Sequence, residues 1–243
     1  EDTALVLDSI RGVDPLDPFQ IDAPFGWDSE RGVAGLRLGY VEADFAEGHA
    51  MDRAALQAAG ELGVTLVPLT RPDLPYDALM SVLFAEAAAS FEELTLSGRD
   101  DALIWQSKEA WPNAFRKARF LSAVDHVQLD RFRGMVMQMM AGLFRGVDAI
   151  IGPSLTGPML VITNFTGHPC LCLPTGLQQA PTRGTMSLAR ARLDLGEAEP
   201  GLQHDVPHTI CVWSRVFDEA PALAIGRALE RRFDYAMHRP PTG

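Results

Sequence analysis

The spacing of apolar and polar residues predicts a chain in which strands alternate with helices. Short apolar runs bounded by Gly, Pro or polar residues indicate strands, and apolar residues three and four positions apart indicate helices. The predicted strands cover residues 35–41, 64–69, 148–151, 170–173 and 209–213. The predicted helices cover residues 3–10, 51–62, 77–96, 122–145, 156–166 and 218–235. The fold class is therefore α/β, with a mixed β-sheet flanked by helices, and strand–helix–strand order over 35–69 predicts a parallel pair.

Side chains at the helix ends and along the helix faces refine this prediction. Ser122 and Asp218 are the expected N-caps of two helices. The 122–145 helix carries an apolar stripe, which we expect to face the core. This stripe consists of Phe132, Val136, Met139, Met140 and Leu143. The first helix is expected to bury one side, made of Ala4, Val6, Leu7 and Ile10.

The chain carries no internal repeat and no clear linker, so residues 1–243 are expected to form a single domain. The strand at 170–173 is expected to stop at the Pro-Thr-Gly sequence of 174–176. Residues 178–205 are rich in Gln, Pro, Gly, Arg and Glu, which predicts a surface insertion. A helical pattern that opens at residue 2 without a preceding cap suggests an incomplete domain whose N-terminal part lies upstream.

Composition narrows the class of protein. The chain has 243 residues, 47% of them hydrophobic and 22% charged, which is typical of a globular protein. Its formal net charge of -11 disfavours direct binding of nucleic acid. No apolar run approaches the about 18 residues of a membrane span, so we expect no membrane partner. Cys170 and Cys172 lie in an apolar run, which predicts reduced, buried thiols and a cytoplasmic protein.

A search for catalytic chemistry in the residues alone identifies no reaction. No serine has the Gly-x-Ser-x-Gly context of a nucleophile elbow, and no phosphate-binding glycine loop is present. The two lysines, Lys108 and Lys117, lie in a polar region where they are expected to remain solvated cations.

Histidines offer two weak candidates for a site. His204, His208 and Cys211 have a spacing that would suit a zinc site on a helix, but Pro207 and the strand that follows argue against a helix there. No metal site is therefore predicted. His168 either lines a pocket or is a structural histidine with satisfied hydrogen bonds, and the second interpretation is favoured.

Several motifs in order along the chain resemble the C-terminal portion of the amidase signature family. The most specific is Thr-Asn-Phe-Thr-Gly-His-Pro-Cys-Leu-Cys-Leu-Pro-Thr-Gly at 163–176. The segment Val-Asp-Ala-Ile-Ile-Gly-Pro-Ser at 147–154 resembles a family strand that ends in Pro-Thr, with Ser154 in place of Thr. Residues 2–18 resemble the segment that follows the family's catalytic region. Only nine residues separate Ser154 from Asn164, where many members carry a longer loop.

The resemblance implies hydrolysis of carboxamides by a Lys–Ser–Ser triad, without a cofactor or a metal. The triad would lie upstream of residue 1, so no catalytic residue is assigned to this chain, which by itself is expected to be inactive. The implied substrate-binding residues are Pro153, Ser154, Asn164, Gly167 and Pro169. An equally supported interpretation is that all five only define turns of the fold. An apolar pocket wall of Met159, Leu160 and Phe165 would suit an aliphatic or aromatic acyl group.

Two alternatives remain open from the sequence. In one, the chain is a non-catalytic amidase-like protein for binding or assembly. In the other, it is the glutaminase-like component of a tRNA amidotransferase, which shares the fold. For the leading hypothesis, the partner is a small-molecule amide substrate, and a homo-oligomer is possible. The sequence does not specify the amide.

Overall fold

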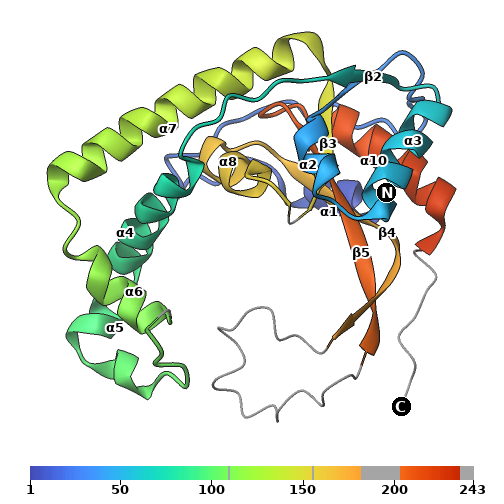
Figure 1. The fold of residues 1–243 in the computed structure, drawn as a ribbon. Helices are drawn as coiled ribbons and strands as arrows, with labels where there is room; N and C mark the ends of the chain where they lie inside the picture. The colour runs from blue at the N-terminus through green and yellow to red at the C-terminus, as the bar shows by residue number, and fades with distance from the viewer. Residues whose placement is uncertain (109, 155, 182–202, 236–243) are drawn as a thin grey trace. The chain divides into compact units, whose positions relative to one another are not determined.

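The strands form one mixed sheet (Figure 1) in a computed structural model that describes residues 1–108, 110–154, 156–181 and 203–235. The strands are β1 (Arg37–Tyr40), β2 (Thr65–Pro68), β3 (Ala149–Pro153), β4 (Cys170–Pro181) and β5 (Gln203–Ser214). Their order across the sheet is β2-β1-β3-β5-β4. β1 is parallel to both β2 and β3, whereas β5 runs antiparallel to β3. The predicted mixed sheet and its parallel pair are confirmed.

The helices cover about as much of the chain as the sequence pattern predicts. They are α1 (Asp2–Ile10), α2 (Glu42–Ala46), α3 (Ala50–Glu61), α4 (Met80–Ser90), α5 (Glu92–Leu96), α6 (Trp111–Ala118), α7 (Ala123–Leu143), α8 (Met159–Thr166) and α10 (Ala220–Phe233). Ser122 caps α7 as predicted, because its Oγ accepts a hydrogen bond of 3.0 Å from the Asp125 amide. Among the described residues, no helix combines the length and the apolar character needed to cross a membrane.

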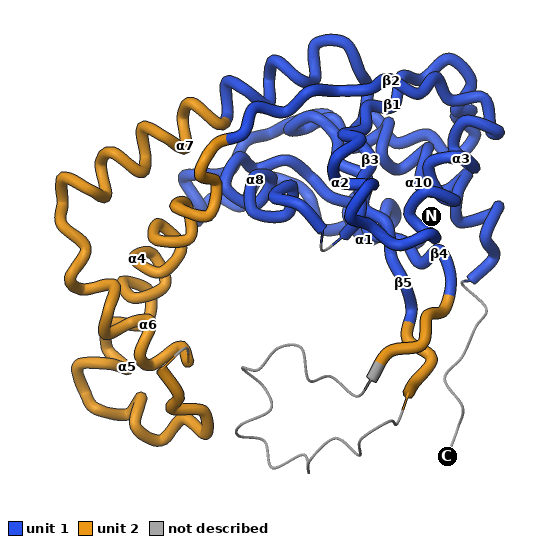
Figure 2. Tube along the Cα trace, viewed as in Figure 1, with its two compact units in different colours: residues 1–73, 137–176, 207–243 blue, residues 74–136, 177–206 orange. Residues whose placement is uncertain are grey.

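By their internal contacts the residues divide into two compact units (Figure 2). Unit 1 consists of residues 1–73, 137–176 and 207–243, and unit 2 consists of residues 74–136 and 177–206. The single-domain prediction for residues 1–243 stays a prediction. Strand β4 continues to Pro181 and β5 begins at Gln203, so the two ends of the predicted 178–205 insertion are strand. Residues 182–202 lie outside the described part of the chain.

The core of unit 1 lies between one face of the sheet and the pair α3 and α10, which contact each other. Alternate strand residues point to this face, as the two-residue period of a strand requires. The strand side chains in this core are Leu38, Ala149, Ile151, Leu173, Ile210 and Val212. The helices contribute Ala55, Leu56, Ala58, Ala59, Ala222, Ala224, Ile225 and Leu229.

Unit 2 contains α4, α5 and α6, and here the predicted 77–96 helix is wrong in one respect. A 3-10 turn covers Tyr76–Leu79, and the helix that follows is broken at Phe91 into α4 and α5. The Phe91 ring stacks on Phe115 of α6 with centroids 5.4 Å apart. This contact between segments distant in sequence cannot be predicted from helical periodicity.

Two further element boundaries differ from the prediction. Strand β4 does not stop at 174–176 but passes through Pro174. A proline is tolerated there because β4 is the outermost strand of the sheet formed by the described residues, where a missing N–H leaves no partner unpaired. The last helix begins at Ala220 with Glu219 as N-cap residue, so the Asp218 cap is wrong; Asp218 instead lies 3.4 Å from the Arg215 guanidinium.

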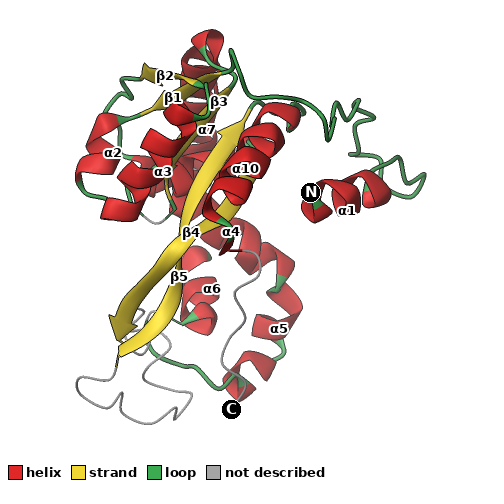
Figure 3. Ribbon diagram, turned by 90° about the vertical axis from the view of Figure 1, so that its right-hand side faces the viewer, coloured by secondary structure: helices red, strands yellow, loops and turns green. Residues whose placement is uncertain are grey.

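The first helix forms where predicted, but its burial differs. Ala4 is buried, whereas Val6 is 58% and Ile10 75% exposed, so the prediction that both face a core is wrong for this chain. Figure 3 shows α1 joined to the strands through a long stretch of loop. The same view shows β4 and β5 as a long two-stranded ribbon.

Candidate functional site

Polar side chains gather at the carboxyl ends of β1 and β3, the end of the sheet that is called the carboxyl edge below. In open α/β sheets this edge is where ligands bind, because loops and helix N-termini converge there. The end of β3 supplies Pro153 and Ser154, two of the predicted substrate-binding residues. Pro153 is paired with Ile210, so the antiparallel β5 brings Thr209 to the same edge. The Thr209 hydroxyl donates a hydrogen bond of 2.9 Å to the Ser154 Oγ.

A buried ion pair holds the loops at this edge. Asp44, in α2 directly after β1, receives two hydrogen bonds from the Arg71 guanidinium, at 2.6 and 2.8 Å. Both side chains are at most 10% exposed. A bidentate pair of this kind fixes geometry as well as charge. It therefore ties the loop after β2 to the helix after β1.

Two glycines let the neighbouring loops approach this edge. Gly157, in the loop after Ser154, has φ +73°, and a Cβ there would lie 2.5 Å from Asp44 Oδ1. At Gly48, between α2 and α3, a Cβ would lie 3.0 Å from Pro153 Cγ. The α2–α3 turn and the loop after β3 are therefore in close contact around the end of β3.

A second polar group connects α3 to β5 at the same edge. His208 Nε2 lies 2.8 Å from Asp52 Oδ1, and Asp52 is 1% exposed. The other carboxylate oxygen of Asp52 accepts a hydrogen bond of 2.7 Å from the His49 amide, which completes the N-terminal cap of α3. The His49 and His208 rings lie 4.9 Å apart. A carboxylate that orients an imidazole in this way is suited to proton transfer or to rigid positioning of the strand end.

Of the other three predicted residues, Pro169 lies near the opposite end of the strands. Its carbonyl accepts a hydrogen bond of 3.2 Å from the Ser214 amide, and Ser214 pairs with Ala149 at the start of β3. Ala149 and Pro153 are four positions apart along β3, a distance of about 13 Å. Gly167 is the left-handed C-cap of α8, and the Asn164 side-chain amide donates a hydrogen bond to the Leu160 carbonyl of its own helix. The structure therefore places Pro153 and Ser154 at one end of β3 and Pro169 near the other, and these contacts of Asn164 and Gly167 are local to α8.

His168 lines a cavity of about 440 Å³ in unit 1, beside the end of α8. Its ring stacks on Phe144 with centroids 5.1 Å apart, and its Nδ1 lies 2.7 Å from the Thr166 hydroxyl. Burial lowers the pKa of His168, which favours the neutral imidazole. Both interpretations of this residue hold: it lines a pocket, and its ring is held by packing and a hydrogen bond.

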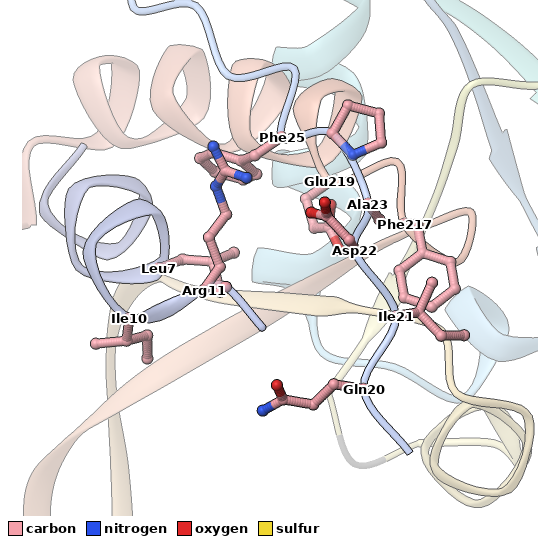
Figure 4. Close-up of a pocket in the computed structure, with 12 residues that line it drawn as sticks. Leu7, Ile10, Arg11, Gln20, Ile21, Asp22, Ala23, Phe25, Phe217 and Glu219 are labelled. Atoms are coloured by element: carbon pink, nitrogen blue, oxygen red, sulfur yellow. The ribbon is translucent and has the colours of Figure 1, made fainter. Parts of the chain in front are cut away.

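A second cavity, of about 260 Å³, lies beside α1 (Figure 4). Leu7 of α1 and its C-cap residue Arg11 line this cavity, as do Ile21 and Phe217. The Arg11 guanidinium lies 5.5 Å from the centroid of the Phe25 ring, a cation–π contact. No serine, cysteine or lysine lines this cavity, so it offers no nucleophile for a catalytic site.

The His204, His208 and Cys211 pattern does not form a metal site. His208 and Cys211 are an odd number of residues apart on β5, so their side chains point to opposite faces of the sheet. The prediction of buried thiols is wrong for Cys170 and Cys172, which are exposed, although Cys211 is buried. All three sulfurs nevertheless lie within 4.8 Å of one another.

Sequence reasoning missed most of the carboxyl-edge group. Asp44, Asp52 and Arg71 belong to no motif, and Asp52 and His208 are 156 positions apart along the chain. The only local signal is the capping arrangement of Asp52 with His49 at the start of α3.

Known proteins similar in sequence match nearly the whole chain. The chain is 27% identical over 265 residues to an amidase of Pseudomonas putida, covering 99% of this chain and 53% of that protein. It is 25% identical over 269 residues to the A component of the glutamyl-tRNA(Gln) amidotransferase of Myxococcus xanthus, covering 99% and 54%. No model of a known protein family matches the chain. The chain spans about half the length of the curated relatives it matches.

Solved structures show the same relationship at the level of the fold. A bacterial aryl acylamidase of the amidase signature family superimposes with a TM-score of 0.65 at 19% identity, covering 98% of this chain and 54% of that one. The 6-aminohexanoate cyclic dimer hydrolase gives a TM-score of 0.67 at 15% identity, covering 99% and 54%. The chain is thus similar in sequence to an amidase and in fold to an amidase signature enzyme, which agrees with the resemblance of the motifs at 147–154 and 163–176.

Proposed function

We propose that this chain forms half of an amidase signature domain that hydrolyses carboxamides to a carboxylate and ammonia or an amine. The observation that carries the proposal is the sequence similarity to an amidase over 99% of the chain, together with the shared fold. In this proposal the chain alone is inactive. The Lys–Ser–Ser triad that the resemblance implies belongs to the part of the family fold that the chain does not span.

In this reaction the chain would supply one wall of the acyl pocket. Pro153 and Ser154 support this role because they end a parallel strand at the edge where ligands bind in such sheets. The Asp44–Arg71 pair and Gly157 would hold the loop after Ser154 in place. Met159, at the start of α8, is buried. Preorganised loops of this kind keep a substrate aligned with a nucleophile supplied from elsewhere.

For Asn164, Gly167 and Pro169 the pocket role stays a prediction. The alternative, that they form the turn between α8 and β4, is supported by the left-handed C-cap at Gly167 and by the place of Pro169 about 13 Å along the strands from Pro153. The His208–Asp52 pair would position the start of the core part of β5 at the pocket edge.

The test is an amide hydrolysis assay on the full-length gene product that contains this chain. We expect ammonia or amine to be released from aliphatic or aromatic carboxamides, and no release by residues 1–243 alone. Release of no ammonia or amine by a folded full-length protein would contradict the proposal. Activity of residues 1–243 alone would contradict the assignment of the nucleophile to another part of the protein.

A substitution at Ser154 tests whether this residue lines the acyl pocket. Ser154→Leu should raise KM for a bulky acyl amide roughly tenfold, while leaving a short acyl amide nearly unchanged, because it narrows the pocket. Ser9→Ala, at an exposed position of α1, is the matched control and should change neither value. An equal effect of Ser154→Leu on the KM values of both substrates would show that Ser154 does not line the acyl pocket.

A second candidate function is that of the A component of a glutamyl-tRNA(Gln) amidotransferase. The observation that favours it is the name of the Myxococcus xanthus relative and of several others at 25–28% identity. This function requires ammonia release from glutamine and its transfer to a glutamate carried by tRNA, with partner proteins. A preference for glutamine over simple carboxamides, and a higher rate of glutamine hydrolysis when such partner proteins are added, would favour this second function.

A non-catalytic role in binding or assembly is the remaining outcome of the same assay. A full-length protein that folds and forms a homo-oligomer, but hydrolyses neither carboxamides nor glutamine, would establish it. The proposal also includes a small-molecule amide as partner, a homo-oligomer and a cytoplasmic location. The hydrolysis assay tests the first of these, and fractionation by size and of cells tests the other two.

A further inference from the structure

Three cysteines lie together on the β4–β5 ribbon: Cys170 and Cys172 on β4, and Cys211, 39 positions after Cys172, on β5. The Cys172 and Cys211 sulfurs lie 3.1 Å apart, and the Cys170 and Cys172 sulfurs 3.8 Å apart. All three sulfurs lie within 4.8 Å of one another. These are the three cysteines of the entire chain. Their convergence therefore gathers every thiol of the sequence into one cluster.

The backbone fixes this cluster. Cys170 and Cys172 are two residues apart on β4, so their side chains point to the same face of the sheet. The Ser214 amide donates to the Pro169 carbonyl, and three residues along each strand from this pair Cys172 lies opposite Cys211. The strand register, and not the chance placement of a flexible side chain, brings the sulfurs together.

We propose that Cys170, Cys172 and Cys211 bind a thiophilic cation, Zn²⁺, through three sulfurs, with the fourth position open to water. Tetrahedral zinc with Zn–S bonds of about 2.3 Å requires sulfurs separated by about 3.8 Å. The Cys170–Cys172 separation of 3.8 Å equals this value and the Cys172–Cys211 separation of 3.1 Å is shorter, so small rotations of the side chains would complete the site. Metal binding does not depend on the proposed amide hydrolysis, although Cys211 pairs with Gly152, the neighbour of Pro153.

The chemistry of the cluster selects the kind of cation. A set of sulfurs alone favours soft or borderline metals over Mg²⁺ and Ca²⁺, which prefer oxygen. Among the described residues, no His, Asp or Glu joins the three sulfurs as a fourth ligand. Cys170 and Cys172 are exposed, which gives a cation access from solvent, while the buried Cys211 anchors the site to the sheet.

The position of the cluster would give a bound metal a structural effect as well, because Cys170 and Cys172 lie on β4 and Cys211 lies on β5. A bound Zn²⁺ would link the outermost strand β4 to β5 at two points of β4, and so stabilise that edge of the sheet.

The test uses the full-length gene product, purified in reductant, stripped with a chelator and titrated anaerobically with Zn²⁺ alone. We expect one Zn²⁺ per chain. Cd²⁺ in place of Zn²⁺ should give the thiolate-to-metal absorption of three sulfurs. Cys172→Ser and Cys170→Ser should each lower the affinity for Zn²⁺ by about 100-fold or more, because each removes a direct ligand. Leu177→Ser, an exposed apolar position on the same strand, is the matched control and should bind Zn²⁺ normally.

Circular dichroism shows whether each variant is still folded, and so distinguishes the loss of a metal ligand from unfolding of the protein. The two exposed cysteines are used because Cys211→Ser changes a buried residue and can disturb the sheet. Absence of stoichiometric Zn²⁺ binding by the folded, reduced protein would overturn the proposal. Unchanged affinity in Cys172→Ser, or a Cys172–Cys211 disulfide that persists in reductant and blocks the metal, would overturn it as well.

Discussion

At the scale of single residues, the Asp44–Arg71 pair carries the most consequential contacts of the carboxyl edge. Removing the arginine leaves the Asp44 carboxylate buried without its partner. The resulting loss in free energy of unfolding is much larger than the stability that the intact pair contributes. Arg71→Met should therefore lower the free energy of unfolding by about 3–5 kcal/mol. Arg53, which pairs with Glu42 at the surface, is the matched control, and Arg53→Met should cost about 0–1 kcal/mol. Urea unfolding of the full-length gene product measures both.

The double variant Asp44→Asn/Arg71→Met provides the second control for this prediction. It removes the buried charge together with its partner, so it should be less destabilised than Arg71→Met alone. Equal losses in Arg71→Met and Arg53→Met would mean that the buried pair does not hold the loops together.

Gly157 is the residue for which a side chain is excluded most clearly. A Cβ at this position would lie 2.5 Å from Asp44 Oδ1, and its φ of +73° disfavours any side chain. Gly98 has nearly the same φ, +72°, but no atom within 4 Å of a Cβ. Gly98→Ala should therefore cost about 1 kcal/mol from the backbone alone, and Gly157→Ala about 2–3 kcal/mol. Thermal melts of the two variants check the difference, and equal shifts in Tm would exclude the clash with Asp44.

The candidate site was only partly predictable at this scale. The resemblance to the family located Pro153 and Ser154, because both belong to a contiguous motif at the end of an apolar strand. It also grouped them with Pro169, which is close in sequence but lies near the other end of the strands. Asp52 and His208 meet only after folding, so neither spacing nor composition indicates their pairing.

At the scale of elements, the packing of α10 on β4 gives a prediction that reverses the usual effect of a glycine substitution. A Cβ on Gly226 would overlap Leu171 Cδ2, whereas a Cβ on Gly134 in α7 has no neighbour within 4 Å. Gly134→Ala should stabilise its helix by about 0.5–1 kcal/mol. Gly226→Ala should instead destabilise the protein by about 1–3 kcal/mol, because it overpacks the core. Chemical denaturation of both variants tests the sign, and a stabilised Gly226→Ala would show that α10 can move away from β4.

The elements themselves were largely predictable. β1 and β2 form within the predicted 35–41 and 64–69 ranges, because each is a short apolar run ended by glycine, proline or a polar residue. The errors concern tertiary contacts. The break at Phe91 follows from a ring stacked on another helix, and the length of β4 follows from its place at the outside of the sheet, where Pro174 is tolerated.

At the scale of the whole molecule, apolar exposure is concentrated in the first part of the chain. Val13, Leu16, Phe19 and Ile21 are each at least 60% exposed, as is Ile10 at the end of α1. Contiguous exposed apolar surface beyond a few hundred Å² is unusual for a monomer and marks a contact site. The chain produced alone should therefore bind a hydrophobic dye and self-associate, with much less of both in the full-length gene product. Dye fluorescence and light scattering measure the two effects, and a dye-silent monomer with a sharp thermal transition would contradict this prediction.

The outermost position of β4 has a consequence for how the protein behaves among other chains. The strand from Cys170 to Pro181 contains no charged residue, and charge is the commonest means of preventing a foreign strand from adding to a sheet edge. Among the described residues, Pro174 provides the protection at this edge, because it lacks the outward N–H that an added strand would need. Replacing this proline would therefore lower the barrier to strand addition, so an imino acid serves here in the role that charged side chains have at other sheet edges.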